Sequence, residues 1–322
     1  MSHTGEFELI GRISAKVKSS IPCGVTGIGD DCAVIPQKEG RDTLVTTDLL
    51  VEDRHFLLDD ISPFDLGWKS AAVNISDIAA MGGKPESAFL SIALPGGTAP
   101  EWVEAFIEGF MELAGRYGVA LLGGDTSASP DKLFINITLL GSCAHGSALL
   151  RSGAVPGDLV CVTGTLGDSG AGLKLILDHS AAENPCLIRR HYRPEPRVQE
   201  GIALAGVPGV HSMMDISDGI ASDLRHILKA SGVGAEVDLR QLPLSPELWE
   251  ICAAKGWDAV ELAVCGGEDY ELLLTVAPEA FEAASAAAGC PLTAIGRIVE
   301  GSEGEIRWTG GARDDYKGFT HF

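Results

Sequence analysis

The chain has 322 residues, of which 45% are apolar, and 45 Asp and Glu against 24 Lys and Arg give it a formal net charge of −21. This length exceeds the size at which single hydrophobic cores usually stop growing, so we expect two domains. The acidic balance argues against a nucleic-acid partner, because that binding depends on basic groups. No stretch approaches the roughly 20 apolar residues of a membrane span, and the polar first residues are unlike a signal peptide, so we expect no membrane contact and a cytoplasmic location.

The first half alternates β-prone stretches with helical patterns. Residues 44–47, 88–94 and 133–140 are expected as strands, and residues 63–81 and 100–117 as helices. Gly118 follows the second helical pattern as a stop signal. Such a mixture predicts an α/β chain of the α+β type.

A second set of elements begins with RSGAVPGDLVCVTG at 151–164, which reads as a turn followed by a strand. TLGDSGAGLKLIL and HYRPEPRVQEGIALA each read as a turn opening a helix, and CGGEDYELLLTV reads as a glycine turn feeding a strand. NISDIAAMGG and DISDGIASDL both place I-S-D at an expected helix start. We place the boundary within 146–156, which gives domains at 1–148 and 149–322.

A group of aspartates lies outside charge runs, beside small or β-prone residues at expected strand ends or helix starts. They are Asp31, Asp48, Asp77, Asp125 and Asp215. Any one could be a helix cap or an Asx turn, and Asp77 and Asp218 are candidates for capping. As a set they suit Mg²⁺, which prefers oxygen ligands and shares them with substrate phosphates. Thr46 and Thr47 could add further oxygens.

The familiar nucleotide-binding motifs are missing from the sequence. It contains no G-x-x-x-x-G-K-[ST] string, no kinase-type glycine loop and no H-R-D motif. GTLGDSGAG looks like a phosphate loop, but a tight strand-to-helix turn explains its glycines equally well. Because the chain is so acidic, metal ions must help to hold any phosphate ligand.

Seven blocks occur in a fixed order along residues 5–322. They are GIGDDCAVI, TTDLLVEDRHF, AAVNISDIAAMGGKP, LLGGDT, RSGAVPGD, MDISDGIASDL and GGEDYEL. In this order the chain resembles the thiamine-monophosphate kinase family, within the aminoimidazole ribonucleotide synthetase superfamily. GGEDYEL and the ending YKGFTHF are similar to the kinase in particular.

The resemblance implies a two-domain aminoimidazole ribonucleotide synthetase-like fold with mixed sheets and flanking helices. It also implies a homodimer formed through the N-terminal half, with ATP and a cluster of Mg²⁺ ions between the domains. The implied reaction is direct in-line phosphoryl transfer from ATP to thiamine monophosphate. No general base is expected, because the acceptor phosphate, with a second pKa of about 6, is already largely ionised at neutral pH.

The resemblance also assigns residues, position by position. Those that match metal ligands are Asp31, Thr46, Thr47, Asp48, Asp77, Asp125, Asp215 and Asp218. Those that match the ATP site are Gly124, Asp125, Arg151 and Ser217. His55 and Glu268 match contacts to thiamine monophosphate, although a packed histidine and a strand-ending glutamate are the plain alternatives. Tyr316 stands where many members carry tryptophan, and we expect its ring to flank the thiamine moiety.

Two alternatives remain open. Another ATP-dependent synthetase of the superfamily would call for a reactive cysteine, yet Cys23 has no basic neighbour and the chain ends in THF. A noncatalytic nucleotide or metal sensor would bind ATP without aligning an acceptor. His55, Glu268 and Tyr316 weigh against a sensor, because it would not need them.

Overall fold

The computed structural model describes residues 24–26, 29–37, 40–301, 303–311 and 313–318, and Cys23 lies outside them. Its first half holds a five-stranded sheet in the order β1-β2-β5-β3-β4. The strands are β1 (Ala33–Pro36), β2 (Arg41–Val51), β3 (Lys84–Pro95), β4 (Ala120–Ser129) and β5 (Phe134–Ala144). β3 and β4 are parallel, and the other neighbours are antiparallel, so the sheet is mixed.

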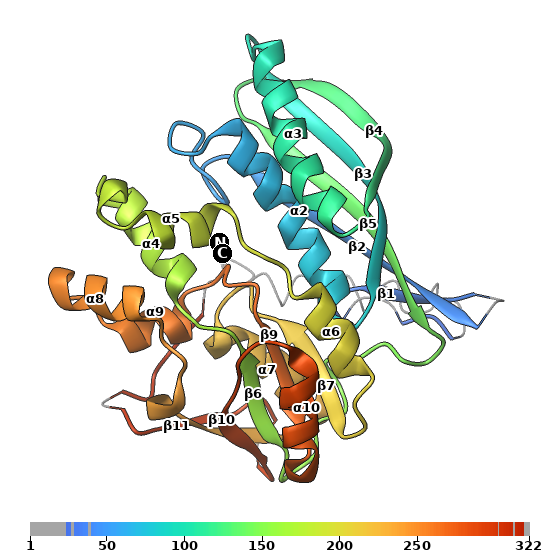
Figure 1. The fold of residues 1–322 in the computed structure, drawn as a ribbon, viewed down its shortest axis with the longest axis vertical. Helices are drawn as coiled ribbons and strands as arrows, with labels where there is room; N and C mark the ends of the chain where they lie inside the picture. The colour runs from blue at the N-terminus through green and yellow to red at the C-terminus, as the bar shows by residue number, and fades with distance from the viewer. Residues whose placement is uncertain (1–23, 27–28, 38–39, 302, 312, 319–322) are drawn as a thin grey trace, which may run out of the picture.

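Two helices, α2 (Pro63–Ala80) and α3 (Pro100–Arg116), cover one face of this sheet (Figure 1). Ser62 caps α2 by accepting a hydrogen bond from the Asp65 amide. The helices touch at two glycines, since a Cβ on Gly67 would lie 1.9 Å from the Phe106 carbonyl oxygen and one on Gly109 1.8 Å from that of Phe64. Close approach buries α2 almost completely, in a core shared with the sheet.

The second half holds a six-stranded mixed sheet in the order β11-β8-β10-β6-β9-β7. Its strands are β6 (Leu159–Thr163), β7 (Val210–Asp215), β8 (Gly234–Asp238), β9 (Leu272–Val276), β10 (Leu292–Val299) and β11 (Ile306–Thr309). The helices are α4 (Asp168–Leu177), α5 (Pro185–Tyr192), α6 (Val198–Ala205), α7 (Ile220–Ser231), α8 (Pro246–Lys255), α9 (Ala259–Cys265) and α10 (Phe281–Ala288). Short 3-10 turns lie at Ala181–Glu183, Leu239–Gln241 and Pro278–Ala280.

The expected fold class is confirmed, and each expected strand or helix of the first half lies within or close to an observed one. The prediction that residues 75–77 start a helix is wrong, because they lie near the end of α2, whose start is fixed by Ser62 and Pro63. The predicted division after residue 148 falls between β5 and β6, where the first sheet ends and the second has not begun.

The other face of the five-stranded sheet is not covered by α2 and α3. Leu49 of β2 and Phe89 of β3 are 53% and 41% exposed there, and Leu122 of the edge strand β4 is 63% exposed. Thr47 and Phe89 both pair with Thr138 of β5, so their side chains share this uncovered face. The sheet therefore presents an apolar surface to solvent in the single chain.

Within the described ranges, no helix combines the length and the apolar character that crossing a bilayer requires. The cytoplasmic location stays a prediction from the sequence.

Candidate active site

One face of α2 looks toward the second half of the chain. Lys69, Val73, Ser76 and Asp77 are spaced at i, i+4, i+7 and i+8, which places them on a common side of a helix. Eight residues of helix span about 12 Å. The two ends of this face therefore reach two parts of the same cleft.

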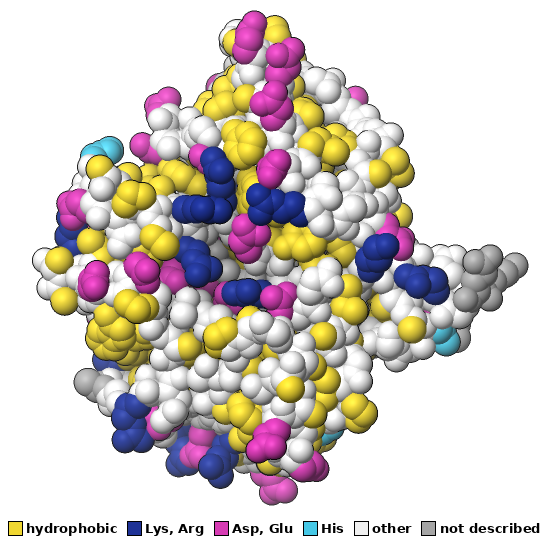
Figure 2. Space-filling model, in the orientation of Figure 1, with side chains coloured by type: hydrophobic (Ala, Val, Ile, Leu, Met, Phe, Trp, Pro, Cys, Tyr) yellow, Lys and Arg dark blue, Asp and Glu magenta, His cyan; other side chains and the backbone are white. Residues whose placement is uncertain are grey.

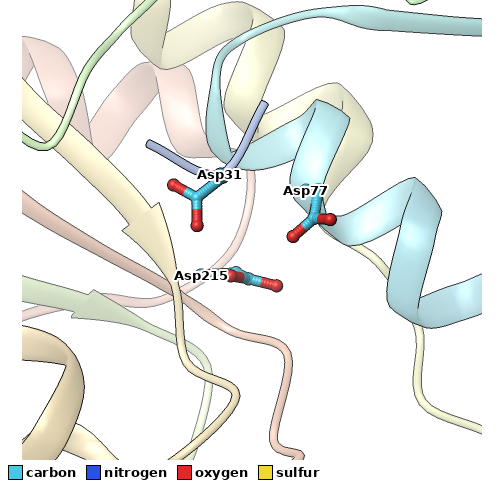
Figure 3. A group of neighbouring side chains, drawn as sticks. All are labelled: Asp31, Asp77 and Asp215. Atoms are coloured by element: carbon cyan, nitrogen blue, oxygen red, sulfur yellow. The ribbon is translucent and has the colours of Figure 1, made fainter. Parts of the chain in front are cut away.

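At one end, Asp77 of α2 meets Asp31, which precedes β1, and Asp215, the last residue of β7 (Figure 3). One carboxylate oxygen from each residue lies within 4.8 Å of the others. The Thr46 hydroxyl donates a hydrogen bond to Asp77, and the Ser76 hydroxyl donates to Asp215 at 2.5 Å. Three distant chain segments thus converge on one oxygen-rich point.

The surroundings disfavour the ionised form of three carboxyl groups at this point, those of Asp48, Asp77 and Asp215. Burial, with the charge of Asp31 adding to it, raises the pKa of Asp215 to about 7. Burial and the neighbouring Asp48, Asp215 and Asp31 raise the pKa of Asp77 well above its usual range. Asp48 is hydrogen-bonded to Asp77, yet burial raises its pKa to about 6. A cation bound among these oxygens would relieve both the burial cost and the repulsion.

Arg151 supplies a positive group beside this cluster. Its guanidinium donates to Asp31 Oδ1 at 2.7 Å and to Oδ2 at 3.4 Å, and its backbone amide donates to Asp30 at 2.6 Å. The charge of Asp31 keeps the pKa of the mostly buried guanidinium above its usual value despite the opposing effect of burial. Since Arg151 starts the second half of the chain and Asp31 lies in the first, this pair also joins the two halves.

A cavity of about 680 Å³ lies between the two halves, and it meets the cluster through Asp48, which lines the cavity and is hydrogen-bonded to Asp77. Asp48 and Asp218 are among its acidic lining residues, and Leu57, Leu173 and Leu177 contribute apolar surface. Charged side chains gather along the boundary between the halves (Figure 2). The cavity can hold a ligand with a charged end and an apolar or aromatic end.

Besides Asp48, four of the predicted site residues line this cavity: His55, Ser217, Asp218 and Glu268. His55 accepts a hydrogen bond from the Val51 amide through Nδ1 at 2.9 Å, which fixes the ring. The prediction that Asp218 caps a helix is not supported, because Gly219 is the N-cap of α7 and the Asp223 carboxylate binds the Ser217 and Asp218 amides at 3.1 Å.

The segment that carries Glu268 is strained. Glu268 and Tyr270 have positive φ values of 62° and 51°, in the left-handed region that side chains rarely adopt. The Glu268 amide donates to the Ser217 carbonyl at 2.8 Å, and the Tyr270 amide to that of Ile216 at 3.0 Å. Strain held in place by surrounding bonds is characteristic of functional sites.

The remaining predicted residues are not brought to the cluster within one chain. Thr47 and Asp125 lie on the uncovered face of the sheet, opposite Asp48, because side chains alternate along a strand. Gly124 of β4 shares a row with Asp48, but three strand spacings, about 14 Å, separate them. Asp48 and Asp125 thus lie inside strands and not at the strand ends that the sequence predicted.

Tyr316 is not among the residues that line the cavity. Its side chain is 3% exposed, and its ring packs edge-on against Trp308 at 5.4 Å, within the core of the second half. Its predicted contact with thiamine therefore gains no support from this arrangement.

GTLGDSGAG forms the start of α4, and a carboxylate of the chain itself occupies that helix end. Asp269 accepts hydrogen bonds from the Gly167 amide at 2.7 Å and the Ser169 amide at 3.2 Å. These are the donors that a phosphate would need. The strand-to-helix turn is thus the reading that the structure supports.

Sequence reasoning missed Lys69 and His191, which both line the cavity. Lys69 donates a hydrogen bond to Glu268 at 2.9 Å and lies 3.4 Å from His191 Nε2. A signal was available, because Lys69 is a lone charge among small and apolar residues, spaced seven and eight residues from Ser76 and Asp77. Sorting the residues of this helix by the face on which they lie would have grouped Lys69 with Ser76 and Asp77.

Comparisons with known proteins place this fold and site in a class. Residues 29–143 match the family described as AIR synthase related protein, N-terminal domain, and residues 155–309 match the corresponding C-terminal domain. The thiamine-monophosphate kinase of Escherichia coli strain K12 is 42% identical over 328 aligned positions, covering 99% of this chain and 98% of the relative. That of Bacillus subtilis strain 168 is 41% identical, covering 94% and 93%.

A solved structure described as "AaThiL complexed with AMPPCP and TMP" superposes with a TM-score of 0.89 at 36% identity. The match covers 100% of this chain and 98% of that one. The chain therefore belongs to the thiamine-monophosphate kinase family.

Proposed function

We propose that this chain is an ATP-dependent kinase that converts thiamine monophosphate into thiamine diphosphate. The observation that carries the proposal is the carboxylate cluster beside a largely apolar cavity, which it meets at Asp48. Such a cavity suits an acceptor with a phosphate at one end and aromatic rings at the other. Relatives that match nearly the whole chain bear the name of this activity.

In the proposed reaction, a phosphate oxygen of thiamine monophosphate forms a bond to the γ-phosphorus of ATP. The bond from that phosphorus to the β–γ bridging oxygen breaks, and ADP leaves with the electron pair. The acceptor oxygen is already ionised, so the chain needs no general base. Its task is to hold two polyanions in line and to offset their repulsion.

The donor set fits Mg²⁺, because it consists of carboxylate and hydroxyl oxygens, and the pKa values of Asp77 and Asp215 are raised. Asp31, Asp48, Asp77, Asp215 and Asp218 would hold the ions. When bound, Mg²⁺ neutralises charge on the phosphoryl oxygens. Arg151 adds a fixed positive charge beside the same carboxylates, and we assign it and Ser217 to ATP.

We further propose a homodimer formed through the uncovered face of the five-stranded sheet. Leu49, Phe89 and Leu122 are exposed large apolar side chains on strands of this one sheet, which suits burial against a second copy. Gly124, Thr47 and Asp125, which the single chain keeps away from the cluster, belong to this face or to its edge strand. Their assigned roles in ATP and metal binding thus depend on the dimer.

A coupled assay of ADP release, with the product identified by mass, tests the activity. We expect ADP and thiamine diphosphate in equal amounts when ATP, Mg²⁺ and thiamine monophosphate are all present. Release of ADP without thiamine monophosphate, or no thiamine diphosphate from folded protein, would contradict the proposal. Excess chelator should abolish turnover and weaken ATP binding in calorimetry.

The dimer is tested by replacing its apolar surface. Phe89→Asp should convert a dimer into a monomer in sedimentation experiments. The dimer would bury the new carboxylate without an opposite charge to pair with it, which is costly. Trp249→Asp is a matched control, since Trp249 is an exposed aromatic residue on α8, outside this face. A wild-type monomer at micromolar concentration would overturn the proposed dimer and leave the proposed reaction standing.

A further inference from the structure

The Lys69 side chain is 1% exposed, although it carries a charge. Lysine is almost never so deeply buried unless it is paired. Its ammonium group lies 2.9 Å from Glu268 Oε2 and 3.4 Å from His191 Nε2, at the wall of the cavity. Because Lys69 lies on α2 and Glu268 before β9, the pair links the two halves of the chain.

His191 is a neutral partner in this group. Burial and the nearby Lys69 lower its pKa to about 3, so the ring carries no charge near neutral pH. An ammonium group can only donate, so Nε2 accepts from Lys69 and the ring proton resides on Nδ1. That Nδ1–H faces the Ser169 hydroxyl at 3.0 Å and Glu268 Oε2 at 3.3 Å.

All three members of the group line the cavity, and Glu268 is the most exposed of them, with 26% of its side chain exposed. Burial disfavours its ionised form, but the Lys69 ammonium outweighs burial and keeps the pKa of Glu268 below its usual range. Since His191 is neutral near pH 7, Lys69 is the main positive charge that faces Glu268. The carboxylate is therefore held ionised and anchored at one oxygen.

A contribution to stability does not by itself explain the buried pair of Lys69 and Glu268. A buried ion pair is often no more stabilising than apolar residues of the same volume. The pair here also holds a residue in a strained backbone conformation, with φ of 62°. An arrangement that costs strain and desolvation and ends at a cavity points to control of where the carboxylate lies.

We infer that Lys69 is a positioning residue that fixes the Glu268 carboxylate as a hydrogen-bond acceptor for the ring end of thiamine monophosphate. The inference rests on the proposed function. It assigns Lys69 no contact with ATP and no part in the bond-making step, since Asp77, on the same face of α2, lies about 12 Å away along the helix. Its loss should therefore affect one substrate only.

The test is a double-mutant cycle with Lys69→Met and Glu268→Gln, read as the KM for each substrate and kcat. Lys69→Met should raise the KM for thiamine monophosphate about tenfold, as expected for a hydrogen bond to a charged group, and leave the KM for ATP within about twofold. The double variant should match Glu268→Gln alone, because Lys69 acts through Glu268. Lys84→Met, at an exposed lysine of β3, is the matched control and should change nothing.

Independent effects of the two substitutions, or an equal rise in KM for both substrates, would overturn the inference. If Lys69→Met does not fold because it leaves a partly buried carboxylate unpaired, Glu268→Gln and the double variant still decide between the outcomes. A further rise in the KM for thiamine monophosphate between those two contradicts the inference, and no rise supports it. Wild-type protein without thiamine diphosphate formation would instead overturn the proposed function, and an active wild type with independent effects overturns only the role of Lys69.

Discussion

Asp48 lies inside β2 with its carboxyl group toward α2, and burial raises its pKa to about 6 despite the hydrogen bond to Asp77. A carboxyl group in that position lowers the stability of the metal-free protein, and it is useful only when a cation is bound. The same holds for Asp77 and Asp215, which share the cluster. Function at these residues is therefore expected to oppose stability.

Asp48→Asn should fold and lose most of its turnover. The amide keeps the shape but removes a charge, so kcat should fall about 100-fold, while the thermal midpoint without metal should stay equal or rise. Turnover and midpoint measured on one preparation check this. Turnover like that of the wild type would remove Asp48 from the site.

Tyr316 leads to a different expectation, since its ring packs against Trp308 in the core. Tyr316→Ala should lower the free energy of unfolding by about 3 kcal/mol, as large-to-small changes in cores do. Tyr316→Phe, which keeps the ring, should stay near the wild type. A normal midpoint together with a raised KM for thiamine monophosphate alone would instead favour the thiamine contact that the sequence predicted.

The sequence was informative about residues whose type alone is diagnostic. Asp31, Asp77 and Asp215 could be grouped because they lie outside charge runs, beside small or β-prone residues, and a set of such carboxylates suggests a cation. Lys69 could not be read in this way, because a helical lysine is usually solvated. Its burial depends on Glu268, which is 199 residues away along the chain.

At the scale of elements, α2 was predicted almost to the residue, because Ser62, Pro63 and the glycine after Met81 mark its ends. β4 was not predicted, since LLGGDT carries two glycines that usually signal a turn. One of them, Gly124, has φ of 152°, and a Cβ there would lie 1.7 Å from the Leu90 carbonyl oxygen. A strand that requires glycine cannot show the alternation by which strands are recognised.

Gly124→Ala should therefore weaken the edge of the first sheet. We expect a loss of about 1–3 kcal/mol in the free energy of unfolding, the usual range for a side chain forced into a strained backbone region. Gly123→Ala is the matched control, because a Cβ there would meet only the Phe89 ring at 3.6 Å, an ordinary contact. Equal midpoints for the two variants in thermal unfolding would contradict this account.

Across the whole molecule, the two halves meet through charged and polar pairs placed around the cleft. Arg151 binds Asp31, Ser76 binds Asp215, and Lys69 binds Glu268. Two units could be predicted from length and from the turn-rich segment at 146–156. How the halves face each other could not, because each of these pairs joins residues more than 100 positions apart.

The metal-free protein should lose stability as the pH rises from about 4 to about 7. The folded-state pKa of Asp48 and Asp215 is raised to about 6 and about 7, so the folded chain holds protons there that the unfolded chain has released. The free energy of unfolding falls with rising pH wherever the folded state binds more protons than the unfolded state. Mg²⁺ should restore the thermal midpoint, most strongly above pH 7.

Thermal scans across this pH range, with MgCl₂ and with NaCl at the same ionic strength, measure the effect. Sodium chloride is the control for screening of the net charge of −21. A midpoint that rises steadily through the window without metal, or an equal gain from both salts, would show that the buried carboxyls do not govern it.

The face of α2 toward the cleft also sets a fixed distance between two parts of the site. A buried helix is stiff, so eight residues fix the separation between the levels of Lys69 and Asp77 at about 12 Å, whatever ligand enters. An acceptor must span that gap to touch Glu268 and present its phosphate to the carboxylate cluster together. Selection by length then accompanies selection by chemistry: a thiazole phosphate without the pyrimidine ring would fit every surface it meets and still fall short of one end.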